Sequence, residues 1–178
     1  MASARTAWAF EHAAETTGYA MKFPRAIRLD QSDIEVFEST AEPGEWAIPG
    51  SFAFINDDPE SLQGKRLQAF KHGFMGTTSF GWCTLVEVAE IDDDEYQQVI
   101  DRLAQHFVRA HGAPHIAAAL PVAADEADYA VTICAHPLHT LLTIERDFGD
   151  EGLIETLKVI RPKDASNHSK VKLWGPED

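Results

Sequence analysis

The clearest hydrophobic pattern lies in the middle of the chain. Apolar residues recur there at the three- and four-residue spacing of one helix face: Tyr96, Val99, Ile100, Leu103 and Phe107. Asp92 and Glu95 precede them with the Asp-x-x-Glu signature of a capping box, and Gly112 follows them at a typical helix end. These residues predict a helix that begins after Asp92.

Alternation of apolar and polar positions predicts strands elsewhere. Residues 23–29 alternate, and Pro24 near their start suits an edge strand. Residues 82–90 form an alternating, β-branched segment. Residues 140–147 and 153–161 flank a glycine-containing connection, which is the pattern of a closing β-hairpin.

Three segments give weaker patterns. Residues 45–55 predict extended structure interrupted by Pro49-Gly50. Asp58 followed by Pro59 is typical of a helix start, and Gly73 of its end. Residues 122–135 suit either a helix or a strand. We favour a helix because one stripe would contain Ala127, Ala130, Val131 and Cys134.

The order of these elements predicts an α+β protein. Strands and helices do not alternate regularly, which disfavours a doubly wound parallel sheet. We expect two layers, with a mainly antiparallel sheet covered on one face by two or three helices. Residues 21–161 form the predicted domain. Residues 1–20 read as a poorly ordered appendage, and residues 162–178 as a polar C-terminal tail.

The charge balance narrows the choice of partner. The chain has 29 acidic and 15 basic residues, a formal net charge of −14. This field disfavours nucleic acid and anionic membranes as partners. No apolar run reaches the length of a membrane span. Only two cysteines occur, without CxxC spacing, which favours a reducing compartment and a cytoplasmic location.

Familiar catalytic and cofactor motifs do not occur. The sequence has no GxGxxG, GxxxxGK[ST], HExxH or GxSxG string. Ser51, Ser79 and Cys83 are the candidate nucleophiles, but none has a base and an orienting group at a recognisable spacing. The sequence therefore predicts no cofactor and favours a protein that is not an enzyme.

Histidine and aspartate residues give one candidate metal site. If the two predicted helices pack antiparallel, the start of the first and the end of the second would bring Asp92 or Asp94 near His136 and His139. Structural zinc normally shows a clearer four-ligand pattern, and helix capping explains the same residues more simply. We expect no tightly bound transition metal.

The most distinctive string is Pro43-Gly44-Glu45-Trp46-Ala47-Ile48-Pro49-Gly50, in which two Pro-Gly turns bracket a short strand. One interpretation is that Trp46 fills the core. The other is that Glu42, Glu45 and Trp46 form an acidic, aromatic contact surface for a partner protein.

Several strings resemble those of a family of small bacterial proteins labelled only as a domain of unknown function. They are Asp30-Gln31-Ser32-Asp33, Glu42-Pro43-Gly44-Glu45-Trp46, Ser79-Phe80-Gly81 and Thr140-Leu141-Leu142. The likeness covers about residues 21–161. It implies an accessory role beside molybdenum-dependent redox enzymes, and it brings no site residue with it.

These observations favour a cytoplasmic accessory or interaction protein that binds a protein partner. The first alternative is a small enzyme or ligand-binding domain with a pocket between helices and sheet. The second is a His/Asp metal-binding protein. The sequence leaves the oligomeric state open.

We expect residues 1–20 to be dispensable for folding, because they lack both a cap and an apolar stripe. Their deletion should leave the melting temperature nearly unchanged. A fall of more than ~5 °C, which corresponds to about 1–2 kcal/mol for a chain of this size, would show that they pack against the domain.

Overall fold

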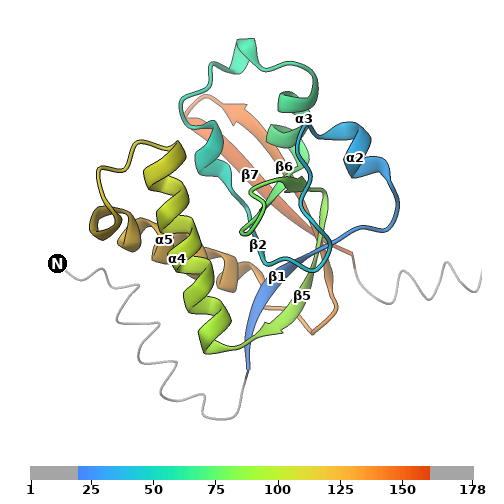
Figure 1. Ribbon diagram of the computed structural model, residues 1–178. Helices are drawn as coiled ribbons and strands as arrows, with labels where there is room; N and C mark the ends of the chain where they lie inside the picture. Colours follow the sequence, from blue (N-terminus) through green and yellow to red (C-terminus); the bar gives the residue numbers. More distant parts are fainter. Residues whose placement is uncertain (1–19, 161–178) are drawn as a thin grey trace, which may run out of the picture.

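The computed structural model describes residues 20–160 (Figure 1). Its elements, in chain order, are β1 (Met21–Ile27), α2 (Ser32–Val36), β2 (Ala47–Ile48), the 3-10 turns η1 (Ser51–Phe54) and η2 (Pro59–Ser61), α3 (Gly64–His72), β3 (Phe74–Gly76), β4 (Trp82–Cys83), β5 (Leu85–Ile91), α4 (Asp93–Ala110), α5 (Ile116–Ile133), β6 (Leu141–Gly149) and β7 (Gly152–Ile160).

The strands form two antiparallel sheets. The first has the order β1-β5-β6-β7, and the second has the order β2-β3-β4. The register of the first sheet places Met21 opposite Ile91 and Ile27 opposite Leu85, so β1 and β5 pair along their full length. The α+β class expected from the sequence is confirmed, with the strands shared between two sheets.

Helix α5 packs against β1 of the first sheet, and α4 packs against α5 (Figure 1). The capping box is present: Glu95 N donates to Asp92 Oδ1 over 2.8 Å, and the Glu95 carboxylate accepts from Asp92 N. The predicted second helix is also present, and small residues line its buried face: Ala119, Ala123, Ala127 and Ala130. No helix within residues 20–160 combines the length and apolarity needed to cross a membrane.

The second helix begins earlier than expected, at Ile116 rather than Val122. The alanine-rich segment before Val122 is helical as well, because alanine has the highest helix propensity. His115 caps this helix by accepting a 3.1 Å hydrogen bond at Nδ1 from Ala118 N. Pro121 is the sixth residue of this helix, so the helix lacks the one backbone hydrogen bond that the nitrogen of residue 121 would otherwise donate to Ala117 O.

Two extended segments are shorter than predicted. Strand β2 covers only Ala47–Ile48, because Gly50 adopts a left-handed φ of 76° and the chain then enters η1. The expected strand over 82–90 divides at Thr84, whose Oγ1 donates to the buried Asp33 carboxylate over 2.9 Å. Its two halves, β4 and β5, belong to different sheets.

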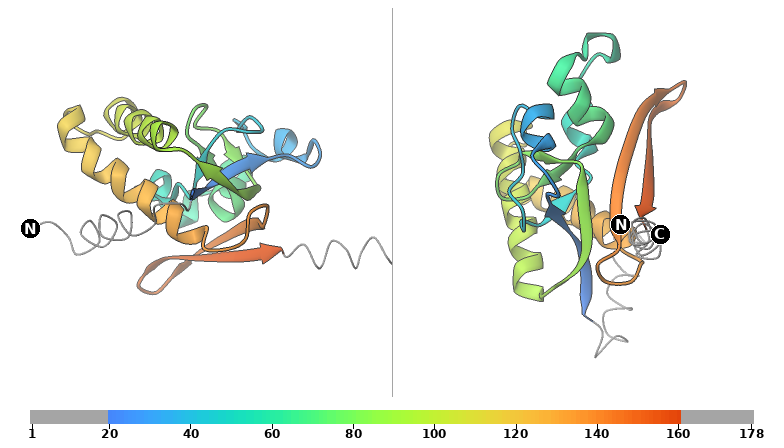
Figure 2. Two further views of the ribbon diagram at one scale, coloured as in Figure 1. Left: turned by 90° about the horizontal axis from the view of Figure 1, so that it is seen from below. Right: turned by 90° about the vertical axis from the view of Figure 1, so that its right-hand side faces the viewer.

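The predicted closing hairpin is present, and most of it separates from the rest of the first sheet. β6 and β7 pair over their whole length, from Leu141 opposite Ile160 to Gly149 opposite Gly152. β5 and β6, by contrast, pair only at Val86–Leu142 and at the adjacent position. Beyond that point the hairpin stands apart from β1 and β5, with β7 outermost (Figure 2).

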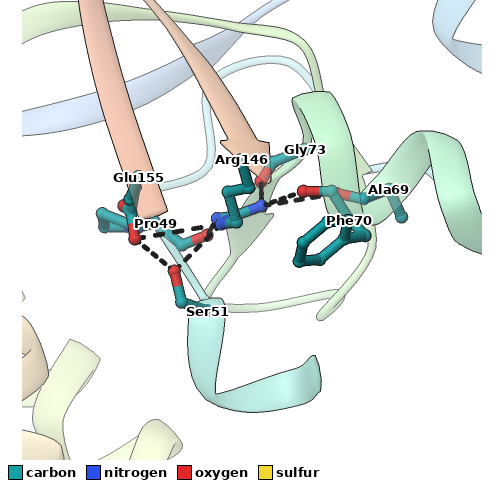
Figure 3. A network of polar contacts seen from close by, with 7 residues as sticks. All are labelled: Pro49, Ser51, Ala69, Phe70, Gly73, Arg146 and Glu155. Atoms are coloured by element: carbon teal, nitrogen blue, oxygen red, sulfur yellow. Dashed lines mark hydrogen bonds and ion pairs between the residues drawn. The ribbon is translucent and has the colours of Figure 1, made fainter. Parts of the chain in front are cut away.

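Arg146 on β6 joins the separated hairpin to the rest of the molecule (Figure 3). Its side chain is completely buried, and burial lowers the pKa of its guanidinium to about 10. Nη1 donates to Phe70 O and Gly73 O, each over 2.9 Å, and more weakly to Ala69 O. These carbonyls terminate α3, so Arg146 serves as the C-terminal cap of that helix.

The remaining guanidinium donors of Arg146 bind the segment that leads into η1. Nη2 donates to Pro49 O, and Nε donates to Ser51 Oγ over 2.9 Å. Ser51 extends this hydrogen-bond network to β7, because its hydroxyl donates to the Glu155 carboxylate. The guanidinium thus holds three segments that are far apart in the sequence.

We predict that Arg146→Met lowers the free energy of unfolding by at least about 3 kcal/mol, because methionine fills the space but leaves the buried carbonyl groups without donors. Urea denaturation measures the change. Lys158→Met is the control, because Lys158 pairs with Glu145 at the surface and its loss should cost less than about 1 kcal/mol. Equal effects of the two substitutions would contradict this role of Arg146.

Candidate functional site

The outer edge of β7 is the most prominent unpartnered feature of residues 20–160. β7 ends the four-stranded sheet and pairs only with β6, although it runs for nine residues. An unpaired strand edge presents backbone N–H and C=O groups that can bind another strand. The edge also carries apolar side chains, because Ile154 is 54% exposed and Ile160 is 40% exposed.

The opposite edge of this sheet is closed by the chain itself. Ala26 N donates to Glu45 O over 2.8 Å, and Gly44 N donates to Ala26 O over 2.8 Å. Pro24 removes another donor from β1. Within the described residues, β7 is therefore the edge of the four-stranded sheet that remains open to another strand.

Acidic side chains lie on the inner side of β7. Glu155 points inward to Ser51 and Arg146 (Figure 3), and its second oxygen, Oε1, is buried without a hydrogen-bond partner within residues 20–160. Burial raises the pKa of the Glu126 carboxyl on α5, and the charge of Glu155 raises it further. Burial likewise raises the pKa of Tyr129, with Glu155 again contributing. Glu126, Tyr129 and Glu155 therefore interact electrostatically between α5 and β7, where the Arg146 guanidinium, 3.9 Å from the Glu155 carboxylate, offsets part of the negative charge.

A small open hollow of about 240 Å³ lies where β6 leaves β5. Its lining combines apolar atoms with a surface ion pair, and the residues are His72, Thr84, Thr143, Ile144, Glu145 and Lys158. The Lys158–Glu145 pair spans 2.6 Å and is well exposed. Sites for drug-sized ligands usually have about 300–1,000 Å³ and enclose the ligand, so this hollow suits a small molecule at most.

The contact residues expected from the sequence are mainly engaged with other parts of the domain. Trp46 is half-buried and meets Phe23 edge to face with ring centroids 6.0 Å apart. The Glu45 carboxylate accepts from Thr78 N over 3.0 Å and from Ser79 N over 2.9 Å, which holds the turn before β4. Glu42 is exposed, and its backbone N–H donates to the same carboxylate.

The metal candidates do not form a donor cluster. Asp92 caps α4, and Asp94 lies in the first turn of the same helix. His139 Nδ1 lies 3.3 Å from a Glu87 carboxylate oxygen, and the His136 backbone carbonyl accepts from a lysine. Within residues 20–160, no group of three or more histidine, cysteine, aspartate or glutamate side chains is arranged to hold a metal ion.

The candidate nucleophiles are engaged in structural contacts. Ser51 lies between Arg146 and Glu155, and Ser79 binds the Glu45 carboxylate. Both cysteines are buried free thiols, and burial raises the pKa of Cys83 strongly and that of Cys134 to about 12. A thiol with such a pKa is protonated at neutral pH and is a poor nucleophile.

An aromatic corner joins the turn before β4 to the end of α4. Phe80 has a φ of 57°, which is rare for a bulky residue, and its ring stacks on His106 with centroids 3.8 Å apart. The His111 ring lies 5.0 Å from that of His106. Burial lowers the pKa of His106 to about 4, with the charges of His111 and Arg109 adding to the effect.

The low pKa of His106 predicts loss of stability in acid. The unfolded chain binds this proton at pH values near 6.5, but the folded chain binds it only near pH 4. The free energy of unfolding is therefore not reduced by this histidine above pH 6.5, and it falls as the pH decreases from 6.5 toward 4. His106→Phe keeps an aromatic stack without the proton. Its stability difference between pH 7 and pH 5, measured by urea denaturation, should be smaller than that of the wild type by roughly 1 kcal/mol. The exposed His72→Gln should reproduce the wild-type difference, and an unchanged difference in His106→Phe would contradict the prediction.

The sequence pattern identified the β7 strand but not the importance of its edge. Alternation places Ile154, Thr156 and Lys158 on one face and Glu155 and Leu157 on the other. It does not specify which strand ends a sheet, because that depends on pairing between distant segments. An isoleucine at each end of the outward face, Ile154 and Ile160, was the available signal.

Comparison with known proteins gives the family of the chain. A family model described as a family of unknown function, DUF6505, matches residues 21–173. No curated protein and no solved structure matches the chain. The match starts where the first strand starts and continues 13 residues beyond Ile160. The chain therefore belongs to the DUF6505 family of unknown function.

Proposed function

We propose that this protein is a non-catalytic accessory protein that binds an extended segment of a partner protein at the outer edge of β7. The open edge of β7 is the observation that carries the proposal. A partner strand added there would bond to the free backbone groups and place alternate side chains against the two faces of the hairpin. The exposed Ile154 and Ile160 would supply apolar contact on the outward face.

The charge distribution favours a partner segment with basic side chains. The whole chain carries a formal net charge of −14, and Glu155 and Glu126 lie on the inner side of the edge. Lysine or arginine at alternate positions of an added strand would approach these carboxylates. Long-range attraction of this kind raises the association rate and falls with added salt.

A binding role agrees better with the geometry than catalysis does. The serine and cysteine candidates in residues 20–160 are either bonded to structural partners or buried as protonated thiols. The hollow beside β6 is open and small, so it supports a second, weaker candidate, the binding of a small molecule between His72 and Lys158. A location in the cytoplasm and a partner from a molybdenum-dependent redox system belong to the proposal and rest on composition and family resemblance.

The proposal predicts capture that depends on the β7 edge. The full chain, attached to a resin, should retain a partner from native cytosol. The double variant Ile154→Lys/Ile160→Lys should retain it at least tenfold less, a loss of about 1.4 kcal/mol, because lysines on a strand edge oppose the addition of another strand. Mass spectrometry with quantified inputs measures the ratio.

The matched control is Ile34→Lys/Ile55→Lys, which adds the same charge at isoleucines that are 48% and 77% exposed away from β7. Capture by the control should equal that of the wild type, and capture should weaken between 0.1 M and 1 M salt. A synthetic peptide covering an extended segment of the retained protein should compete with it. Equal capture by the edge and control variants would refute the proposal.

A further inference from the structure

The C-terminal part of the chain follows directly after β7, the strand with the open edge. β7 ends at Ile160, and the family match continues from there through Leu173. Residues 161–173 are therefore part of the sequence that defines the family, together with the strands and helices before them.

The length and pattern of this segment suit a strand beside β7. Residues 161–169 provide nine positions for a reversal of direction, where a tight β-turn needs only two. Lys170, Val171, Lys172 and Leu173 then alternate basic and apolar side chains with the period of a strand.

The charge of the segment is opposite to that of the molecule. Residues 161–173 contain a single acidic residue, Asp164, and four basic residues: Arg161, Lys163, Lys170 and Lys172. The chain as a whole carries a formal net charge of −14. The basic side chains of residues 161–173 would therefore be attracted to the carboxylates on the inner side of β7, Glu155 and Glu126.

We propose that residues 170–173 add to the outer edge of β7 as an antiparallel strand and occupy it until a partner displaces them. This inference rests on the proposed function for its biological meaning, because the tethered segment would compete with the partner for one edge. Tethering gives the segment a high effective concentration, so a partner must bind more tightly than the free edge alone would require.

Amide hydrogen exchange in the full chain tests the occupant without any partner. Gly149 and Gly152 flank a two-residue turn, so they form a hydrogen-bonded pair. By alternation, the odd-numbered amides of β7 point to the open edge: Leu153, Glu155, Leu157 and Val159. A four-residue strand can accept from only two of these amides, so nuclear magnetic resonance should find two consecutive odd-numbered amides protected in the wild type by at least about tenfold over an open edge.

The diagnostic variant is Val171→Pro, which removes a donor from the added strand and should abolish the protection. Ala165→Pro is the matched control, because it places proline in the reversal and should leave the protection intact. The double variant Lys170→Glu/Lys172→Glu should reduce the protection most at low salt, where like charges repel most strongly. Exchange of the even-numbered β7 amides, which bond to β6, reports that the hairpin itself is unchanged.

Each other outcome overturns the inference. Fast exchange of all four odd-numbered amides in the wild type would show an unoccupied edge. Protection that persists in Val171→Pro would assign the edge to a different occupant, and protection that falls on dilution would assign it to a second copy of the chain. Edge-dependent capture of a partner would remain valid in all three cases, so failure of this inference is distinct from failure of the proposed function.

Discussion

The buried guanidinium of Arg146 is the contact on which the arrangement of the hairpin depends. A charge in the interior is tolerated only when its hydrogen-bonding capacity is matched, and here backbone carbonyls of α3 and of the Pro49 segment, together with Ser51, provide the match. The partners come from separate parts of the chain, so one side chain sets the position of α3, the η1 turn and β6 at once. The Phe70 and Phe148 rings, stacked with centroids 4.4 Å apart, add apolar contact beside it.

This arrangement explains why the first sheet divides. Arg146 and Phe148 point toward α3, and the outer half of β6 therefore follows that helix instead of continuing along β5. β7 is carried outward with it and becomes the end of the sheet. The open edge proposed as the interaction surface is thus a consequence of how a buried charge is satisfied on the other strand of the hairpin.

Sequence patterns predicted the elements whose signals are local. The capping box at Asp92 and the apolar stripe after it gave the helix, and the alternation around residues 140–160 gave the hairpin. Patterns failed where tertiary contacts decide the structure. Thr84 divides an alternating strand because it binds Asp33, and the role of Arg146 leaves no local trace, because an arginine in a strand normally faces solvent. Glu45 and Trp46 stood out in the sequence, but the sheet edge could emerge only from the pairing of distant strands.

The two-residue connection of the hairpin has a consequence for the order of folding. β6 and β7 are neighbours in sequence, so they can pair within microseconds, whereas the partners of Arg146 lie 73 to 97 positions away along the chain. The guanidinium therefore remains hydrated while the hairpin forms, and it leaves water only when the folded α3 and the Pro49 segment present their carbonyls together. Docking of a preformed hairpin becomes a late step, and separation of that hairpin becomes an early step of unfolding. The same part of the molecule that offers an edge to other strands is thus the part whose local opening exposes a buried charge.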